Sequence, residues 1–285
     1  MAVTLTGALK LPAPGKLNVF LHVTGRREDG YHNLESLFVP IARGDIITLE
    51  PRNDGGIART RGPNGIAPEV DLTVRAARLL QKHCRHKLGV SICVDKCLPV
   101  GGGLGGGSSD AATVMLGLNR LWQLGLSREE LMTLGLNLGA DVPFFIFGEP
   151  AFAQGIGEKL AAVTFPPTWF VVLTPDVEVS TAAIFAAPEL TRNSESAKMP
   201  VFSEGYGRND LFAAAAARFP EIARCVDALA HVAPRARPRM TGSGACVFAA
   251  FAAESAAQQA LSGMPRGITG FVARSLSRHP LWLYA

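Results

Sequence analysis

The sequence is poor in charged residues and has no long apolar run, and each shortage excludes a class of protein. Only 18% of the 285 residues are charged, and the net charge of +4 includes no block of lysines or arginines. Nucleic-acid-binding proteins usually carry such a block, so we expect no nucleic-acid partner. No stretch approaches the ~18 uninterrupted apolar residues of a membrane-spanning helix. We therefore expect no membrane partner either.

Cysteine is also scarce, and its pattern argues against disulfides and metal sites. The five cysteines are an odd number with irregular spacing, and Cys93 and Cys97 do not form a C-x-x-C pair. The first residues lack the ordered charged, apolar and small-residue regions of a secretory signal. These features predict a cytoplasmic protein whose thiols are small core residues. We expect no metal site built from protein ligands.

The remaining composition is that of an ordered globular protein, with 48% apolar residues. Helical and alternating patterns are mixed along the chain, and the pattern resets near residue 160, which predicts an α+β fold with two lobes. Ser127 followed by Glu130 predicts a capped helix start. The predicted strands are 16–23, 37–41, 45–50, 90–94, 169–173 and 271–275. The predicted helices are 72–83, 109–124, 129–138, 180–186, 210–218, 221–231 and 253–261, with loops over 51–68 and 192–208.

Six of the seven residues from Gly101 to Gly107 are glycine. Glycine loses more conformational freedom on folding than any other residue, so the run implies unusual turns or a ligand that comes very close. Gly101, Gly103 and Gly106 fit G-x-G-x-x-G, but the next helix leads into another helix, which disfavours a Rossmann dinucleotide site. No G-x-x-x-x-G-K-[ST] sequence occurs, so a Walker A loop is excluded.

The run is followed by Ser108, Ser109 and Asp110, which we expect to open the helix over 109–124. Free N–H groups and the positive dipole end at a helix start attract anions, and glycines let a polyphosphate lie against the backbone. The two hydroxyls could bind phosphate or a metal ion. Asp110 could cap the helix, and we expect it to point away from phosphate. A bare glycine turn with a helix cap is the alternative.

Other candidate residues are ambiguous on their own. Asp141, in G-A-D-V-P, could accept a proton from a hydroxyl, or it could be an ordinary turn aspartate. Lys16 could stabilise developing charge, or it could be solvated at a strand end. Tyr31 and His32 follow a D-G turn and could stack on and read a base, or be half-buried loop residues.

Taken together, these motifs resemble the GHMP kinases, a superfamily of small-molecule kinases. "PVGGGLGGGSSDAA" looks like their nucleotide loop. "PAPGKLNVFLHVTGRREDGYHNLESLF", "GADVPFF" and "MTGSGACVFAAF" extend the resemblance over essentially the whole chain, toward the branch that acts on a diphosphocytidyl-linked methylerythritol. The resemblance implies an N-terminal lobe like domain 2 of ribosomal protein S5 (1–160) and a ferredoxin-like C-terminal lobe (161–285). The active site would lie in the cleft between them.

The implied reaction transfers the γ-phosphoryl of ATP to the 2-hydroxyl of 4-diphosphocytidyl-2-C-methyl-D-erythritol, in non-mevalonate isoprenoid precursor biosynthesis. In that reading Asp141 is the catalytic base and Lys16 supports it. The implied nucleotide-binding residues are Lys96, Pro99, Val100, Gly101, Gly102, Gly103, Leu104, Gly105, Gly106, Gly107, Ser108 and Ser109. The implied substrate-binding residues are Asn18, Tyr31, His32, Phe185, Gly242, Ser243 and Gly244.

The resemblance also sets expectations about cofactors and partners. Mg²⁺ would arrive with the nucleotide, and the chain would be a monomer or a weak homodimer. Gly15 and Asp71 depart from the pattern, since the family usually has alanine and often has asparagine there. Other GHMP enzymes, such as homoserine or mevalonate kinases, remain open alternatives, as does a nucleotide-binding module without catalysis.

Overall fold

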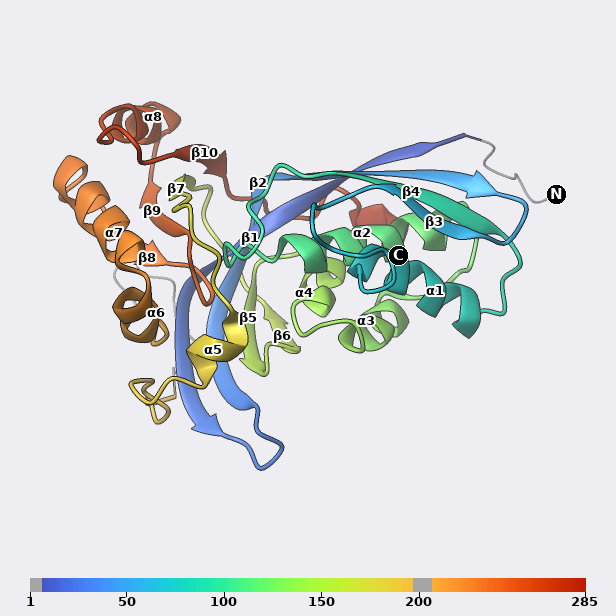
Figure 1. The fold of residues 1–285 in the computed structure, drawn as a ribbon, viewed down its shortest axis with the longest axis horizontal. Helices are drawn as coiled ribbons and strands as arrows, with labels where there is room; N and C mark the ends of the chain where they lie inside the picture. Colours follow the sequence, from blue (N-terminus) through green and yellow to red (C-terminus); the bar gives the residue numbers. More distant parts are fainter. Residues whose placement is uncertain (1–6, 197–206) are drawn as a thin grey trace.

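A computed structural model describes residues 7–196 and 207–285, which form two lobes, each with its own sheet (Figure 1). A long antiparallel hairpin, β1 (Leu9–Arg26) and β2 (His32–Arg52), forms the centre of the first lobe. Its sheet has the order β3-β4-β2-β5-β6, with β1 also paired to β2. The other strands are β3 (Ile57–Arg61), β4 (Gly89–Asp95), β5 (Ala151–Gly155) and β6 (Lys159–Ala162).

Four helices cover this sheet: α1 (Leu72–His83), α2 (Gly106–Leu121), α3 (Arg128–Leu136) and α4 (Val142–Phe147). Helix α2 is central, because it packs on both β1 and β2 and on each of the other three helices. Its apolar residues Val114, Met115 and Leu118 are fully buried in the first core, with Leu49 and Phe144. This burial fixes α2, and so fixes the loop that precedes it.

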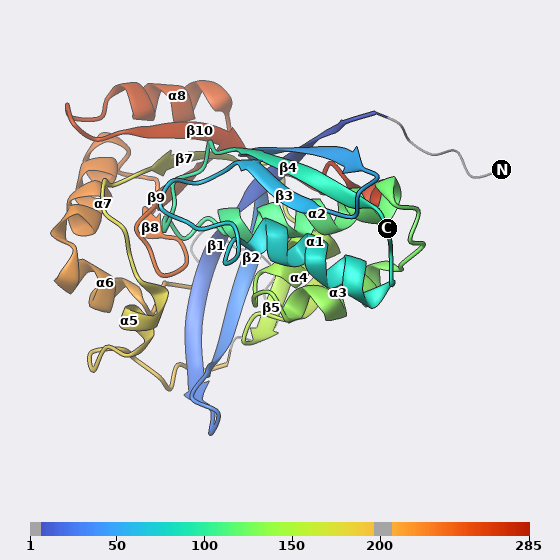
Figure 2. The same cartoon turned by 45° about the vertical axis from the view of Figure 1, so that its right-hand side comes forward.

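The second lobe has a wholly antiparallel sheet in the order β10-β7-β9-β8, covered by helices (Figure 2). Apart from the small α5, the chain order is strand, helices, strand, strand, helix, strand, and the strands lie in the order 4-1-3-2. That order is the ferredoxin-like topology, which confirms the prediction. The elements are β7 (Trp169–Leu173), α5 (Thr181–Phe185), α6 (Phe212–Arg218), α7 (Pro220–Val232), β8 (Arg239–Met240), β9 (Val247–Phe251), α8 (Glu254–Ser262) and β10 (Gly270–Arg274).

The two lobes share apolar and backbone contacts. A third core cluster joins Leu17 and Phe20 of β1 to Phe170 and Phe248 of the second sheet. Isolated bridges pair Leu21 with Asn209 and Ile41 with Ser275. Burying this much apolar surface between the lobes holds their relative position.

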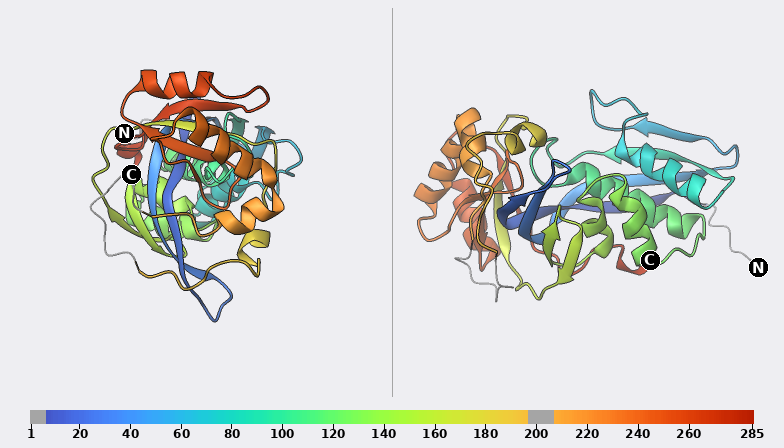
Figure 3. Two further views of the ribbon diagram at one scale, coloured as in Figure 1. Left: turned by 90° about the vertical axis from the view of Figure 1, so that its left-hand side faces the viewer. Right: turned by 90° about the horizontal axis from the view of Figure 1, so that it is seen from below.

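The last residues of the chain return to the first lobe, where the C-terminus lies beside its helices (Figure 3). The His279 N–H donates to Gly148 O at 2.7 Å, and Leu281 is buried in the first core. The Trp282 ring lies under the guanidinium of Arg128 at 4.1 Å and that of Arg278 at 4.8 Å. The sequence division at residue 160 places this tail in the second lobe, whereas its packing completes the first.

Several predicted boundaries differ from the observed ones. Two predicted strands, 37–41 and 45–50, are parts of the single strand β2, and β3 lies inside the predicted loop 51–68. Helix α2 begins at Gly106, three residues before the predicted start. The capping box at Ser127 and Glu130 is present as predicted. The predicted loop 192–208 falls partly outside the described residues.

Candidate active site

A cavity of about 1110 Å³ lies between the lobes. The glycine loop, the turn of the β1–β2 hairpin, helix α5 and the turn at Gly242 and Ser243 all line it. Such a cleft at a domain junction is a common place for a ligand site.

Lys16 and Asp141 meet inside this cavity. Lys16 lies on β1 and is 3% exposed, and its Nζ is 3.5 Å from Asp141 Oδ2. Asp141 immediately precedes α4, and its side chain keeps 32% of its surface exposed toward the cavity that it lines. The Lys16 Nζ also lies 4.8 Å from the centre of the Phe38 ring. The arrangement sets a buried cation beside a carboxylate that a substrate hydroxyl could reach.

Asn18 lines the cavity, but the polar atoms of its side chain bind within the protein. Its Oδ1 accepts from Lys16 Nζ at 2.5 Å, and its Nδ2 donates to Ser36 Oγ at 2.9 Å. The Asn18 N–H donates to Thr241 Oγ1 at 2.9 Å, which links this strand to the second lobe. The structure therefore places Asn18 so that it holds Lys16.

The glycine loop uses backbone conformations that suit glycine. Gly101, Gly103 and Gly105 all have positive φ, between 69° and 75°. A Cβ on Gly103 would lie 2.2 Å from Thr241 O, so the loop presses directly against the second lobe. Helix α2 begins just after Gly105 and has no side-chain cap. Its first N–H groups are therefore free to bind an anion.

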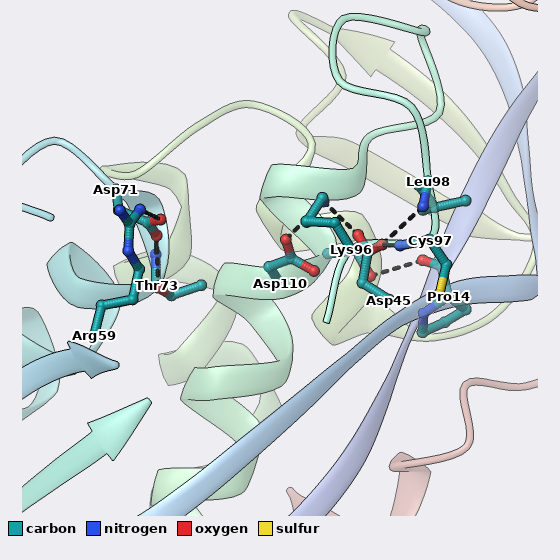
Figure 4. Close-up of polar contacts among 10 residues, drawn as sticks. Pro14, Asp45, Arg59, Asp71, Thr73, Lys96, Cys97, Leu98 and Asp110 are labelled. Atoms are coloured by element: carbon teal, nitrogen blue, oxygen red, sulfur yellow. Dashed lines mark hydrogen bonds and ion pairs between the residues drawn. The ribbon is translucent and has the colours of Figure 1, made fainter. Parts of the chain in front are cut away.

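The residues after the glycines do not all lie where the sequence suggested (Figure 4). Ser108 lines the cavity, but Ser109 is fully buried and its Oγ donates to Pro14 O at 2.7 Å. The Ser109 hydroxyl therefore does not face the cavity, which corrects its predicted role there. Asp110 does not cap the helix, because α2 starts earlier. Instead it is 4% exposed, lines the cavity and pairs with Lys96 Nζ at 3.0 Å.

Lys96 lines the cavity but forms ion pairs with two carboxylates of the protein, Asp110 and Asp45. Burial opposes its charge, yet the two carboxylates outweigh burial and raise the pKa of Lys96. Burial raises the pKa of Asp110 to about 7, although Lys96 acts in the opposite direction. Asp45 Oδ1 also accepts from Leu98 N at 2.8 Å and so holds the start of the glycine loop. Sequence reasoning missed Asp45, which lies 51 positions before Lys96.

The departure at Asp71 has a local explanation in the same view (Figure 4). Asp71 caps α1, because its Oδ1 accepts from Thr73 N at 2.8 Å, and it forms a buried ion pair with Arg59. Arg59 also donates to Ile66 O at 2.5 Å. A carboxylate at position 71 is therefore matched by a buried guanidinium. Nearby Val70 is 63% exposed and forms part of the apolar wall of the cavity.

Tyr31, His32 and Phe185 gather at another part of the cavity lining. Tyr31 is 59% exposed at the hairpin turn, while the His32 ring stacks on Phe185 with centroids 5.2 Å apart. Arg192, which sequence reasoning missed, donates from Nε to His32 Nε2 at 3.2 Å. Burial, with the charges of Arg192 and Arg26, lowers the pKa of His32. The placement of a base between Tyr31 and Phe185 stays a prediction.

The turn of the second lobe contributes two of its three predicted residues. Gly242 and Ser243 line the cavity, and Ser243 Oγ lies 2.8 Å from Thr181 Oγ1 of α5. Gly244 is not among the lining residues, and its N–H donates to Thr241 O at 3.0 Å. Its predicted contact with substrate stays a prediction.

Two properties of the described residues concern membranes and metal ions. Among residues 7–196 and 207–285, no helix is long and apolar enough to cross a membrane. The same residues contain no group of three or more His, Cys, Asp or Glu side chains that could hold a metal ion.

Comparison with known proteins identifies the family. The model of the GHMP kinases N terminal domain matches residues 71–149. The 4-diphosphocytidyl-2-C-methyl-D-erythritol kinase of Thiobacillus denitrificans is 56% identical over 271 residues, covering 95% of this chain and 96% of that protein. The chain belongs to this kinase family.

Solved structures agree with this membership. A crystal structure of a 4-(cytidine 5'-diphospho)-2C-methyl-D-erythritol kinase matches with a TM-score of 0.82 and 32% identity, over 94% of this chain and 99% of that one. Homoserine kinase from Cytophaga hutchinsonii matches with a TM-score of 0.70 at 16% identity, over 98% of each chain. The second likeness shows the GHMP kinase fold alone.

Proposed function

We propose that the protein transfers the γ-phosphoryl group of ATP to the 2-hydroxyl of 4-diphosphocytidyl-2-C-methyl-D-erythritol, in non-mevalonate isoprenoid precursor biosynthesis. The observation that carries this proposal is the Lys16–Asp141 pair, 3.5 Å apart, in the cavity that the uncapped start of α2 also enters. Phosphoryl transfer needs mainly positioning, charge stabilisation and an acceptor for the hydroxyl proton. This cavity contains candidates for all three.

In this mechanism the glycine loop binds the phosphates of ATP through backbone N–H groups. Asp141 accepts the proton of the substrate hydroxyl as the new P–O bond forms and the bond to ADP breaks. Lys16, held by Asn18, stabilises the negative charge that develops near the transferred group. Tyr31, His32 and Phe185 bind the cytidine end of the substrate.

The proposal includes Mg²⁺, a cytoplasmic location and a monomer or weak homodimer. Mg²⁺ commonly binds through nucleotide phosphates and water with one or two protein oxygens, and the Ser108 hydroxyl is a suitable neighbour on this chain. The ion supplies charge neutralisation for the triphosphate when it is bound. We also propose 1–160 and 161–285 as the two domains, with the tail that contains Leu281 packed on the first.

The test is an assay of ADP release with ATP, Mg²⁺ and the diphosphocytidyl substrate, with homoserine, mevalonate and galactose as control acceptors. Asp141→Asn should lower kcat by about 10²- to 10⁴-fold while nucleotide binding is retained. Unchanged turnover in this variant would contradict Asp141 as the base. ADP release with a control acceptor but not with the diphosphocytidyl substrate would favour another GHMP activity.

A further inference from the structure

Arg192 connects the wall of the cavity to the ring of His32. Its Nη2 donates to Phe185 O at 3.2 Å and to Ala187 O at 2.7 Å, and its Nη1 donates to Leu190 O at 3.1 Å. These three bonds fix the guanidinium plane. The Nε group donates to His32 Nε2 at 3.2 Å.

This contact determines which nitrogen of His32 carries the proton. A guanidinium donates only and keeps its charge, so His32 Nε2 must act as the acceptor. An imidazole whose Nε2 accepts a hydrogen bond is neutral and carries its hydrogen on Nδ1. The lowered pKa of His32, caused first by burial and then by Arg192 and Arg26, agrees with a neutral ring.

The Nδ1–H group is available to a ligand. His32 lines the cavity, and no residue in the described parts of the chain hydrogen-bonds its Nδ1. The ring is held in place on its other side by stacking on Phe185, with 26° between the planes. The protein thus presents one fixed donor where the proposed function places the cytidine end.

We propose that Arg192 is a positioning residue that makes the site selective for cytosine over uracil, by holding His32 as a donor at Nδ1. The inference rests on the proposed function, which supplies the cytidine. Position 3 of cytosine is an acceptor, whereas position 3 of uracil is an N–H donor. In this proposal the fixed Nδ1–H donor meets position 3, so it binds cytosine and leaves two donors facing each other with uracil. Such an unpaired contact is a strong source of discrimination.

The experiment compares kcat/KM for the diphosphocytidyl substrate and its diphosphouridyl analogue in the full-length protein. Arg192→Met removes the donor, lets the His32 proton move to Nε2, and should lower the cytosine-to-uracil ratio by about tenfold. Arg192→Lys retains a cationic donor and should restore part of the ratio. Arg26→Met is the matched control, because Arg26 adds positive charge near His32 while its side chain makes no hydrogen bond to the His32 ring in the described structure. It should leave the ratio unchanged even if KM rises.

A second measurement reads the tautomer directly. The wild-type protein is labelled with ¹⁵N at its six histidines and studied by NMR. The His32 signals are those that disappear in the His32→Gln variant. They should show the hydrogen on Nδ1. Hydrogen on Nε2 in the wild type would overturn the inference. So would an unchanged base ratio in a folded Arg192→Met protein. If Arg192→Met does not fold, the inference is tested by the His32 tautomer of the wild type and by the cytosine-to-uracil ratio of Arg192→Lys.

The two proposals fail in different ways. If the wild-type protein does not phosphorylate the diphosphocytidyl substrate, the proposed function fails, and base selectivity at this site fails with it. If it does so but has no preference over the uridine analogue, only the role of Arg192 fails.

Discussion

The two ends of the cavity offer different chemical groups to a ligand. The end formed by the glycine loop offers backbone N–H groups at the start of α2, and its charged side chains, Lys96 and Asp110, pair with each other. The end beside Tyr31 offers rings from separate parts of the chain, since His32 of β2 stacks on Phe185 of α5.

The difference shows what each ligand requires. A phosphate group needs donors at close range and can be bound by consecutive residues, provided that no side chain stands between. A base needs a shaped slot with polar groups at fixed positions, which only tertiary structure can assemble. Substitutions that add atoms should therefore have the larger effect at the glycine-loop end. Substitutions that remove side-chain atoms should have the larger effect at the Tyr31 end.

The largest effect should come from an atom added at Gly103. Gly103→Ala places a methyl group 2.2 Å from Thr241 O. It also forces a non-glycine residue to adopt a φ of +75°. We expect a loss of about 3 kcal/mol in the free energy of unfolding. Chemical denaturation followed by circular dichroism measures this loss.

Gly107→Ala is the matched control within the same loop. Its Cβ would meet nothing closer than Leu72 Cδ1 at 3.7 Å, and Gly107 lies inside helix α2. The substitution should leave stability unchanged or raise it by about 0.5 to 1 kcal/mol. It should nevertheless raise the KM for ATP, because the methyl group lies on the cavity surface. Equal destabilisation by both substitutions would contradict the close lobe contact at Gly103.

The next effect concerns a ring lost from the cytidine end. Tyr31→Ala should raise the KM for the diphosphocytidyl substrate about tenfold or more, since stacking on an aromatic ring contributes ~1–3 kcal/mol per base. The KM for ATP should not change. Because Tyr31 is 59% exposed, the melting temperature should also stay the same.

Tyr31→Phe tests whether the ring or its hydroxyl is responsible. It keeps the stacking surface, so its KM should remain near that of the wild type. A tenfold rise in Tyr31→Phe would assign the interaction to the hydroxyl and would remove stacking as the explanation.

The smallest effect should be a pH dependence at the glycine-loop end. The pKa of Asp110 is raised from 3.8 to about 7, so between about pH 4 and pH 7 the folded chain holds a proton that the unfolded chain has released. The contribution of Asp110 to the free energy of unfolding is present at low pH and falls as the pH rises through that window. Asp110→Asn cannot ionise, so its stability relative to the wild type should grow by about 1 kcal/mol between pH 5 and pH 6. Thermal denaturation without nucleotide over this range measures the difference, and parallel curves would contradict it.

The sequence was informative where function depends on neighbours in the chain. The run from Gly101 to Ser109 predicted a phosphate site because turn, glycines and helix start are consecutive, and that site stays a proposal. The capping box at Ser127 was predictable for a similar reason, since it depends on two residues three positions apart. The ferredoxin-like order of the second lobe was expected from the family resemblance, not from local patterns.

The rest depends on contacts that no local pattern encodes. The start of α2 was placed too late because glycine has a low helix propensity. Packing of α2 against β1, β2 and the other three helices of the lobe overrides that propensity at Gly106 and Gly107. The partners Asp45 and Arg192 come from distant positions, and their side chains have no distinctive spacing. Ser109 shows the same limit, because only the fold reveals that its hydroxyl is bound to Pro14.

The C-terminal tail bears on how the protein is made. The first lobe contains the glycine loop, Lys16 and Asp141, yet its core includes Leu281, which is synthesised after the whole second lobe. Synthesis proceeds from the N-terminus, and domains usually fold in that order. Here the lobe that emerges first from the ribosome cannot complete its packing until the whole second lobe has been translated. A partial translation product that ends after the first sheet would therefore lack a finished core, and the first lobe would be fully packed only once Leu281 has been synthesised.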